Sequence, residues 1–236
     1  MSMSNSYFRF KEFVVHQEHC AMKVTTDACL FGAWVAARMK KGTVLDIGAG
    51  TGLLSLMLAQ AGCDAIDAIE IQEPDYRQAV ENVKGSKWEH QIRLINADVR
   101  VHPFNLMYNV IVSNPPFYES DLKGNVSGKN IAHHDEGLLL PDLLGLIKKQ
   151  LSLAGSFYLL FPAKRAAALL QEIAQTGYCI HSLCYVKQTE KHHPFRIMIE
   201  AGASKKEVQK QEIIIRERGN YSGAFIELLR PYYLHL

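Results

Sequence analysis

Residues 44–60 read VLDIGAGTGLLSLMLAQ, in which two apolar runs flank a glycine-rich turn. The first run has the length of a buried strand, and the second has the length and composition of a buried helix. Gly48, Gly50 and Gly52 let the backbone turn sharply and pass close to a ligand. Their N–H groups lie near a helix N-terminus, where a negative group such as a carboxylate is favoured. The stretch therefore predicts a strand–turn–helix unit that binds a nucleotide-like molecule.

The spacing of the glycines argues against a dinucleotide. Dinucleotide-binding turns have the pattern G-x-G-x-x-G, whereas here the third glycine comes one residue early and Leu53 follows it. Asp46 precedes the turn. A carboxylate there would repel a pyrophosphate but attract the ammonium or sulfonium group of S-adenosylmethionine, directly or through water. We therefore expect S-adenosylmethionine as the cofactor.

Two further acids follow later strands. The apolar run 65–69 ends at Glu70, which can accept hydrogen bonds from both ribose hydroxyls, and the run 92–95 leads to Asp98, which can accept from the adenine amino group. Each acid alone is more often a solvated strand end. In an open α/β sheet, however, ligands bind beyond the carboxyl ends of the strands, where these side chains would converge.

The tetrapeptide Asn114-Pro115-Pro116-Phe117 follows the apolar run 109–113. The prolines stiffen the turn and remove two backbone donors. The Asn114 amide oxygen and the Pro115 carbonyl can then accept hydrogen bonds from an exocyclic amino group, and Phe117 can stack on a flat base. Alternatively, the prolines merely end a strand and Phe117 belongs to the core. Together with the glycine turn, the pattern indicates methylation of an amine.

Helical and strand-like stretches alternate along the chain, which is typical of a doubly wound α/β fold. The expected helices are 26–40, 53–61, 74–85, 140–153 and 163–176. The strands fall between them, with a fifth at 155–161 and a closing pair at 179–187 and 196–203.

Beyond these motifs, the chain resembles the bacterial tRNA1(Val) adenine-37 N6-methyltransferase family of class I S-adenosylmethionine-dependent methyltransferases. The resemblance is carried near the N-terminus by Phe8–Phe13, Cys20–Asp27 and Leu30–Trp34, and near the C-terminus by Tyr221–Leu228 with Tyr232 and Tyr233. It implies a mostly parallel, seven-stranded, Rossmann-like sheet whose last strand runs antiparallel. It also implies one methyltransferase domain, residues 1–236, made of an N-terminal segment 1–42 and a catalytic core 43–236.

The same resemblance implies which residues act. The cofactor contacts would come from the turn between Asp46 and Gly52, from Glu70 and Asp98, and from Asn114. The target amine would be held by Asn114 and Pro115, within the active turn completed by Pro116 and Phe117. Lys23, Thr26 and Asp27 would border the cofactor pocket; the alternative is a helix N-cap at Thr26 or Asp27 with Lys23 in solvent.

Composition agrees with a globular enzyme. The 236 residues are 48% hydrophobic and 21% charged, which suffices for one sizeable core. No apolar run approaches the roughly 20 residues that cross a bilayer, and the first residues lack a signal pattern, so we expect a cytoplasmic protein without a membrane partner. The five cysteines are odd in number and form no C-x-x-C pair, which argues against a disulfide framework or a zinc site.

The stretch 118–136 has no periodic apolar pattern and follows the Asn-Pro turn directly. It is long for an irregular connection, which favours a substrate lid or, alternatively, a disordered surface loop. His133 and His134 lie within it, but no catalytic base is required, because the methylated ammonium loses its proton readily to water.

Positive charge gathers near the C-terminus. Residues 187–236 carry nine Lys and Arg against six Asp and Glu, although the net charge of the whole chain is only +2. Lys187, Lys191, His192, His193 and Arg196 fall at an expected hairpin, followed by Lys205, Lys206 and Lys210. They are consistent with one side of an RNA cradle in which Phe195 or Tyr221 stacks on a base; a solvated charged face is the alternative.

We therefore expect N6-methylation of adenosine 37 in the anticodon loop of tRNA1(Val), with tRNA as partner and no obligate protein partner. The same proline turn also serves methyltransferases of ribosomal RNA bases and of protein glutamine, so these substrates stay open. A DNA substrate is disfavoured because no room remains for a recognition domain. A non-catalytic RNA-binding module would be expected to have lost the glycine or proline turn, and this chain retains both.

Overall fold

The computed structural model of the chain describes residues 6–20, 22–115 and 138–236. Its strands are β1 (Tyr7–Arg9), β2 (Val14–His16), β3 (Thr43–Ile47), β4 (Ala65–Glu70), β5 (Ile92–Asn96), β6 (Tyr108–Ser113), β7 (Leu151–Pro162), β8 (Cys179–Thr189), β9 (Arg196–Gly202), β10 (Gln209–Glu217) and β11 (Asn220–Tyr221). Its helices are α1 (Thr26–Ala36), α2 (Leu53–Gln60), α3 (Glu73–Lys84), α4 (Leu140–Gln150), α5 (Ala166–Gln175), α6 (Gly223–Leu229) and the 3-10 turn η2 (Ala163–Arg165).

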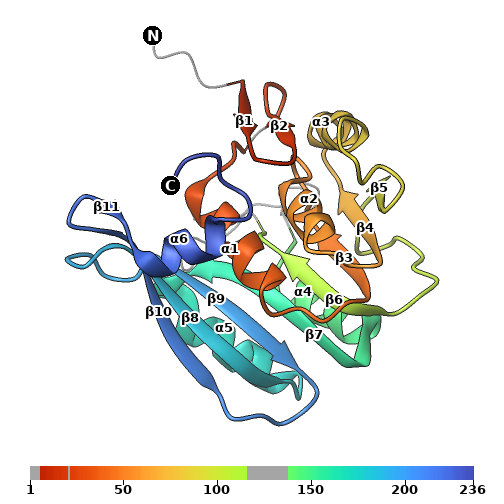
Figure 1. The fold of residues 1–236 in the computed structure, drawn as a ribbon. Coiled ribbons are helices and arrows are strands. Elements are labelled where there is room, and N and C mark those ends of the chain that lie inside the picture. Colours follow the sequence, from red (N-terminus) through yellow and green to blue (C-terminus); the bar gives the residue numbers. More distant parts are fainter. Residues whose placement is uncertain (1–5, 21, 116–137) are drawn as a thin grey trace, which may run out of the picture.

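A nine-stranded sheet, in the order β11-β10-β8-β9-β7-β6-β3-β4-β5, forms the centre of the molecule (Figure 1). The strands β7, β6, β3, β4 and β5 pair in parallel, whereas β9 runs antiparallel to both of its neighbours. The predicted doubly wound fold and its antiparallel strand are confirmed. The predicted count of seven strands was too low, because β10 adds in parallel to β8 and carries β11 beyond it.

Helices cover both faces of the sheet. One core cluster joins α1, α2, α3 and α6 to one face, and a second joins α4 and α5 to the other. Successive side chains of β6 show the division, because Val110 and Val112 enter the first cluster while Ile111 enters the second. Both faces being buried explains why the central strands read as continuous apolar runs rather than as alternating ones.

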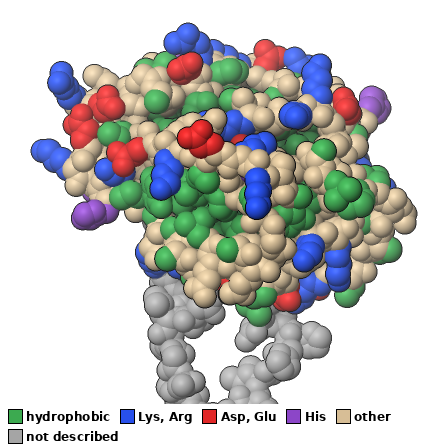
Figure 2. All heavy atoms as spheres, turned by 90° about the horizontal axis from the view of Figure 1, so that it is seen from below, with side chains coloured by type: hydrophobic (Ala, Val, Ile, Leu, Met, Phe, Trp, Pro, Cys, Tyr) green, Lys and Arg blue, Asp and Glu red, His purple; other side chains and the backbone are tan. Residues whose placement is uncertain are grey.

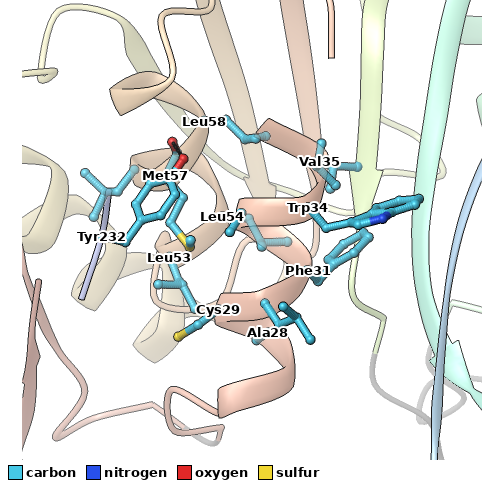
Figure 3. Packing of buried hydrophobic residues seen from close by; sticks show 14 of the residues in the cluster. Ala28, Cys29, Phe31, Trp34, Val35, Leu53, Leu54, Met57, Leu58 and Tyr232 are labelled. Atoms are coloured by element: carbon cyan, nitrogen blue, oxygen red, sulfur yellow. Dashed lines mark hydrogen bonds between the residues drawn. The ribbon is translucent and has the colours of Figure 1, made fainter. Parts of the chain in front are cut away.

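The first core cluster is built around the contact of α1 with α2 (Figure 3). Gly32 of α1 permits this approach, since a Cβ there would lie 2.6 Å from the sulfur of Met57. Trp34 points toward the sheet and meets Tyr158 of β7 edge to face at 6.0 Å. The hydroxyl of Tyr232 donates to the carbonyl of Met57 at 3.2 Å, which fastens the C-terminal segment to the same helix pair.

The N-terminal segment is docked on the core rather than extended from it. β1 pairs with β2, and an isolated bridge joins Phe10 to Tyr233 near the other end of the chain. The Lys11 N–H donates to the Tyr232 carbonyl at 2.8 Å. The rings of Phe8, Phe10 and Tyr233 lie against one another, which gives these aromatic residues a packing role.

Several predicted boundaries were wrong by a few residues. The first helix ends at Ala36 instead of residue 40, and the helix predicted at 163–176 begins as a 3-10 turn before α5. The helix predicted at 140–153 ends at Gln150, and β7 starts at Leu151 instead of residue 155. Leu151 pairs with Tyr108 of β6, and the register shift before the pair of Val110 and Ser156 places the start of β7 at this earlier residue.

Within the described residues, no helix is long and apolar enough to span a membrane. The same residues contain no group of three or more His, Cys, Asp or Glu side chains able to hold a metal ion.

Candidate functional site

Within the described residues, the strands that carry most of the predicted site residues end at one edge of the sheet. β6, β3, β4 and β5 are parallel neighbours, so their carboxyl ends lie side by side. The Ser113 hydroxyl donates to the Ile47 carbonyl at 2.8 Å, which ties the end of β6 to the end of β3. The Asn-Pro turn, Asn114 and Pro115, thus follows directly beside the glycine turn, Gly48–Gly52.

The three glycines of this turn all adopt positive φ, at 74°, 54° and 79° for Gly48, Gly50 and Gly52. Their N–H groups are already used: they donate to Ile69 O, to the Glu70 carboxylate and to Ala49 O. We predicted that these N–H groups would lie where a ligand carboxylate is favoured. In the structure each of the three already has an acceptor inside the protein. A Cβ at position 48 or 50 would meet nothing within 4 Å, so open space lies beside the backbone.

Asp46 is completely buried at the end of β3. One of its carboxylate oxygens, Oδ2, accepts from the Ser55 hydroxyl at 2.7 Å, while Oδ1 has no hydrogen-bond partner. Burial raises the pKa of Asp46 to about 6, although the bond from Ser55 lowers it. A buried carboxylate oxygen without a partner is costly in the folded chain, and a cationic or N–H-bearing ligand would satisfy it.

Glu70 is held in place by the backbone around it. Its carboxylate accepts from the N–H of Gly50 at 3.0 Å and of Gln72 at 2.8 Å. Asn96, at the end of β5, donates to the Glu70 carbonyl at 2.9 Å. Only 7% of Glu70 is exposed, and its carboxylate keeps further lone pairs for a ligand hydroxyl.

Asp98 lies in the segment after β5, but its carboxylate faces Arg100. The Arg100 guanidinium donates to it at 2.6 to 3.0 Å, and this bond lowers the pKa of Asp98. A partly exposed ion pair of this kind is worth at most about 1 kcal/mol. A ligand amino group can therefore displace Arg100 at little cost.

The loop before α1 borders the same edge. Burial raises the pKa of the Cys20 thiol to about 12, and the charges of Asp75 and Glu70 raise it further while that of Lys23 lowers it. Lys23 donates to the Gln17 carbonyl and, at 3.5 Å, to the Glu18 carbonyl, so it holds the loop together.

The start of α1 differs from the predicted alternative. The N-cap is Thr25, whose hydroxyl accepts from the Ala28 N–H at 3.4 Å, rather than Thr26 or Asp27. Thr26 is the exposed first residue of the helix. Asp27 accepts from Arg196 Nε of β9 at 2.7 Å, which commits its carboxylate to an ion pair across the sheet edge.

Pro116, Phe117 and the expected lid 118–136 lie outside the described residues. Of the tetrapeptide, Asn114 is partly exposed and Pro115 is buried.

One contributor was not anticipated from the sequence. Asn82 of α3 is 2% exposed, and its side chain bonds three backbone groups. It accepts from the His16 N–H at 2.8 Å, donates to the His16 carbonyl at 2.8 Å and donates to the Thr51 carbonyl at 2.9 Å. Asn82 thus connects the N-terminal hairpin to the glycine turn. The only sequence signal is an amide within an otherwise amphipathic helix.

Replacing Asn82 by alanine is expected to destabilise the protein by about 2–4 kcal/mol, because it leaves three inward-facing backbone groups without their partner. It is also expected to weaken cofactor binding, since the Thr51 carbonyl loses its anchor. Gln78, one turn earlier, is the matched control because it accepts from the His19 N–H in the same loop at 3.4 Å. Thermal unfolding and calorimetry with S-adenosylmethionine measure both effects. Equal losses of affinity in N82A and Q78A would show that the glycine turn keeps its conformation without the hydrogen bond from Asn82.

Comparison with known proteins assigns the chain to a family. Residues 23–140 match the model of the methyltransferase small domain. Over 236 residues, the chain is 38% identical to a protein of Dyadobacter fermentans named tRNA1(Val) (adenine(37)-N6)-methyltransferase, covering 98% of each chain. A protein of the same name from Pseudoalteromonas translucida is 35% identical, with 98% of this chain and 100% of the relative covered.

Solved structures share the fold at low sequence identity. A predicted O-methyltransferase from Agrobacterium tumefaciens superposes with a TM-score of 0.66 at 14% identity, covering 86% of this chain and 95% of that one. A ribosomal protein L11 methylase from Lactobacillus delbrueckii gives a TM-score of 0.58 at 17% identity, covering 82% and 84%. At these identities the likeness concerns the fold alone.

Proposed function

Because the chain belongs to the tRNA1(Val) (adenine(37)-N6)-methyltransferase family, we propose that it uses S-adenosylmethionine to methylate N6 of adenosine 37 in the anticodon loop of tRNA1(Val). The observation that carries the proposal is the meeting of Asp46, Glu70 and the Asn-Pro turn at one sheet edge. The substrate is an RNA, and the proposed place of action is the cytoplasm, where tRNA is modified. No DNA and no obligate protein partner enter the proposal.

The residues present suit the methyl donor. S-adenosylmethionine supplies an electrophilic methyl group on a sulfonium centre. The Oδ1 atom of Asp46 has no hydrogen-bond partner, so it can accept from the cationic amino acid moiety of the ligand. The open space at Gly48 and Gly50 admits a ligand beside the backbone. Glu70 is already oriented by two backbone N–H groups to accept from ribose hydroxyls. Asp98 is proposed to accept from the adenine once Arg100 moves aside, and Lys23 and Thr26 to border the pocket.

The Asn-Pro turn is proposed to hold the target. The Asn114 amide oxygen and the Pro115 carbonyl accept from the two N–H bonds of the exocyclic amine, which fixes its nitrogen in line with the methyl group. As positive charge develops on that nitrogen, the same two acceptors stabilise it. We propose that Pro116 stiffens this turn and that Phe117 stacks on the adenine. The proton then leaves to water, so no histidine is needed as a base.

We also propose that residues 1–236 act as one methyltransferase domain. The segment 1–42 is held to the core by Asn82 and by the bridge from Phe10 to Tyr233. An anticodon-loop base is already unpaired, so presenting it to the site costs little.

The test is methyl transfer from labelled S-adenosylmethionine to total bacterial tRNA that lacks the anticodon-loop methylation, followed by nucleoside analysis. N6-methyladenosine at position 37 of tRNA1(Val) is the expected product. Label in ribosomal RNA or in protein glutamine instead would keep the amine chemistry and overturn the substrate. Absence of transfer to any of these would overturn the enzymatic proposal.

A further inference from the structure

Three arginines lie over aromatic rings at the carboxyl edge of the sheet. Arg165 lies over Phe161 at 5.3 Å, Arg196 over Phe195 at 5.6 Å and Arg216 over Tyr221 at 4.4 Å. These pairs belong to η2, to β9 and to the β10–β11 hairpin.

The strand order brings the three pairs into one row. The Ala163 N–H, after β7, donates to the Phe195 carbonyl at 3.1 Å, and the Phe195 N–H donates to the Val186 carbonyl of β8 at 2.9 Å. β10 follows in parallel, with Arg216 opposite Thr189. β7 also pairs in parallel with β6, whose end carries the Asn-Pro turn. From β6 to β10 the edge crosses four strand spacings, about 19 Å, a length comparable to several nucleotides.

This edge is much more basic than the rest of the molecule. The segments 163–165, 187–196 and 214–221, here called the basic edge, contain seven Lys and Arg but two Asp and Glu, whereas the whole chain has a net charge of +2. Lys187 and Arg196 of this edge also meet acids of neighbouring elements, Glu212 at 3.0 Å and Asp27 at 2.7 Å. The rest of the sequence contains 19 Lys and Arg against 22 Asp and Glu. On the face in Figure 2, Lys and Arg lie dispersed among acidic and hydrophobic side chains.

The Tyr221 ring orients an arginine rather than offering itself to a base. Tyr221 stacks on Phe225 at 4.6 Å with an angle of 17° between the rings, and Arg216 lies 4.4 Å from its centre. Two groups at these distances cannot share one ring face, so Tyr221 is sandwiched between them. The sequence-based prediction that Tyr221 stacks on a base is therefore not met by this arrangement. The Arg216 guanidinium donates one of its five N–H groups to the Gly219 carbonyl at 3.0 Å, and its position over the ring orients the planar group toward a phosphate or a base.

We propose that the basic edge is the track along which single-stranded RNA next to the target adenosine lies, with Arg165 and Arg216 binding its phosphates or stacking on its bases. This inference rests on the proposed function, which requires an unpaired base at the Asn-Pro turn. Single-stranded RNA is the occupant because ordered guanidinium planes beside positive charge suit splayed nucleotides, whereas duplex RNA is bound through its shape and backbone.

The test measures binding without catalysis. A fluorescent anticodon stem–loop of tRNA1(Val) is titrated with the wild type and with the variant R165Q/R216Q at several salt concentrations. The matched control is K148Q/K149Q, which removes two exposed lysines near the end of α4, at the opposite edge of the sheet. Thermal unfolding checks that each variant is folded, and R165K/R216K restores charge without the planar fork.

For R165Q/R216Q we expect Kd to rise about tenfold or more and the slope of log K against log salt to fall by about 1.4, since each lost contact to single-stranded phosphate removes about 0.7. The control should change neither quantity, and the lysine pair should restore the slope but not all of the affinity. Equal affinity of R165Q/R216Q and the control would overturn the track. An equal loss with a blunt duplex of the stem would overturn the single-stranded assignment. If the wild type binds as expected but methylates no tRNA, the proposed function fails while the track stands.

Discussion

Replacing Asn114 by alanine is expected to lower kcat about 100- to 1,000-fold while leaving the Kd for S-adenosylmethionine within about threefold of the wild type. The reason is that the amide oxygen of Asn114 accepts from the amine and gains strength as that nitrogen becomes positive. An interaction that is stronger in the transition state than in the ground state affects the rate more than it affects binding. The alanine variant keeps the Pro115 carbonyl, so turnover should fall steeply without vanishing.

Single-turnover kinetics with saturating tRNA, together with calorimetry for the cofactor, separate the two quantities. N105A is a matched control, because Asn105 is exposed in the segment leading to the start of β6, at the opposite edge of the sheet. Unchanged turnover in N114A would refute the proposed catalytic role of the Asn114 side chain. A large loss of cofactor affinity with an unaltered rate would reassign Asn114 to donor binding.

Local patterns in the sequence predicted the glycine turn and the acids at strand ends. The turn has positive φ at Gly48, Gly50 and Gly52. Because glycine adopts this conformation without strain, the three glycines indicate it directly in the sequence. Asp46 and Glu70 are readable because each ends a strand of a parallel sheet. The pairing of Asp98 with Arg100 was equally local and was missed, although the two residues are separated by one position.

What the sequence could not predict depends on contacts between distant residues. Asn82 bonds His16 and Ser113 bonds Ile47, each across 66 residues of chain, and neither side chain breaks a local pattern. β10 was missed for a related reason: only Ile213 and Ile215 of this strand are buried, so its polar beginning reads as loop. Pairing with β8 supplies the stabilisation that local propensity lacks.

The second large effect concerns the charge of Asp46. In the folded chain burial raises its pKa to about 6 from the ordinary 3.8. A carboxyl group with a raised pKa stabilises the fold below pH 4 relative to neutral pH, and this contribution is lost as pH rises through 6. The difference amounts to about 3 kcal/mol at pH 7. Asp46→Asn removes the titration, so the ligand-free variant should be more stable than the wild type above pH 6 and equally stable below pH 4.

The same charge should govern donor binding. Because a cationic ligand favours the ionised carboxylate, wild-type affinity for S-adenosylmethionine should fall up to about tenfold for each pH unit below 6. In D46N the amide has a single oxygen. If that oxygen accepts from the Ser55 hydroxyl, the NH2 group takes the position of Oδ1 and faces the cation of the ligand. We expect the variant to bind the cofactor about 30- to 100-fold more weakly at pH 7.5, with little dependence on pH.

Calorimetry from pH 5 to pH 8, paired with thermal unfolding of the ligand-free proteins, tests both halves of this prediction. D64N is the control, since Asp64 is an exposed acid before β4, at the far edge of the sheet. A stabilised D46N that binds S-adenosylmethionine as tightly as the wild type would mean that the buried charge serves neither the fold nor the donor. A destabilised D46N would instead assign the carboxylate to the structure of the turn through Ser55. Only higher stability together with weaker, pH-independent binding fits a charge that the fold tolerates at a cost because the methyl donor needs it.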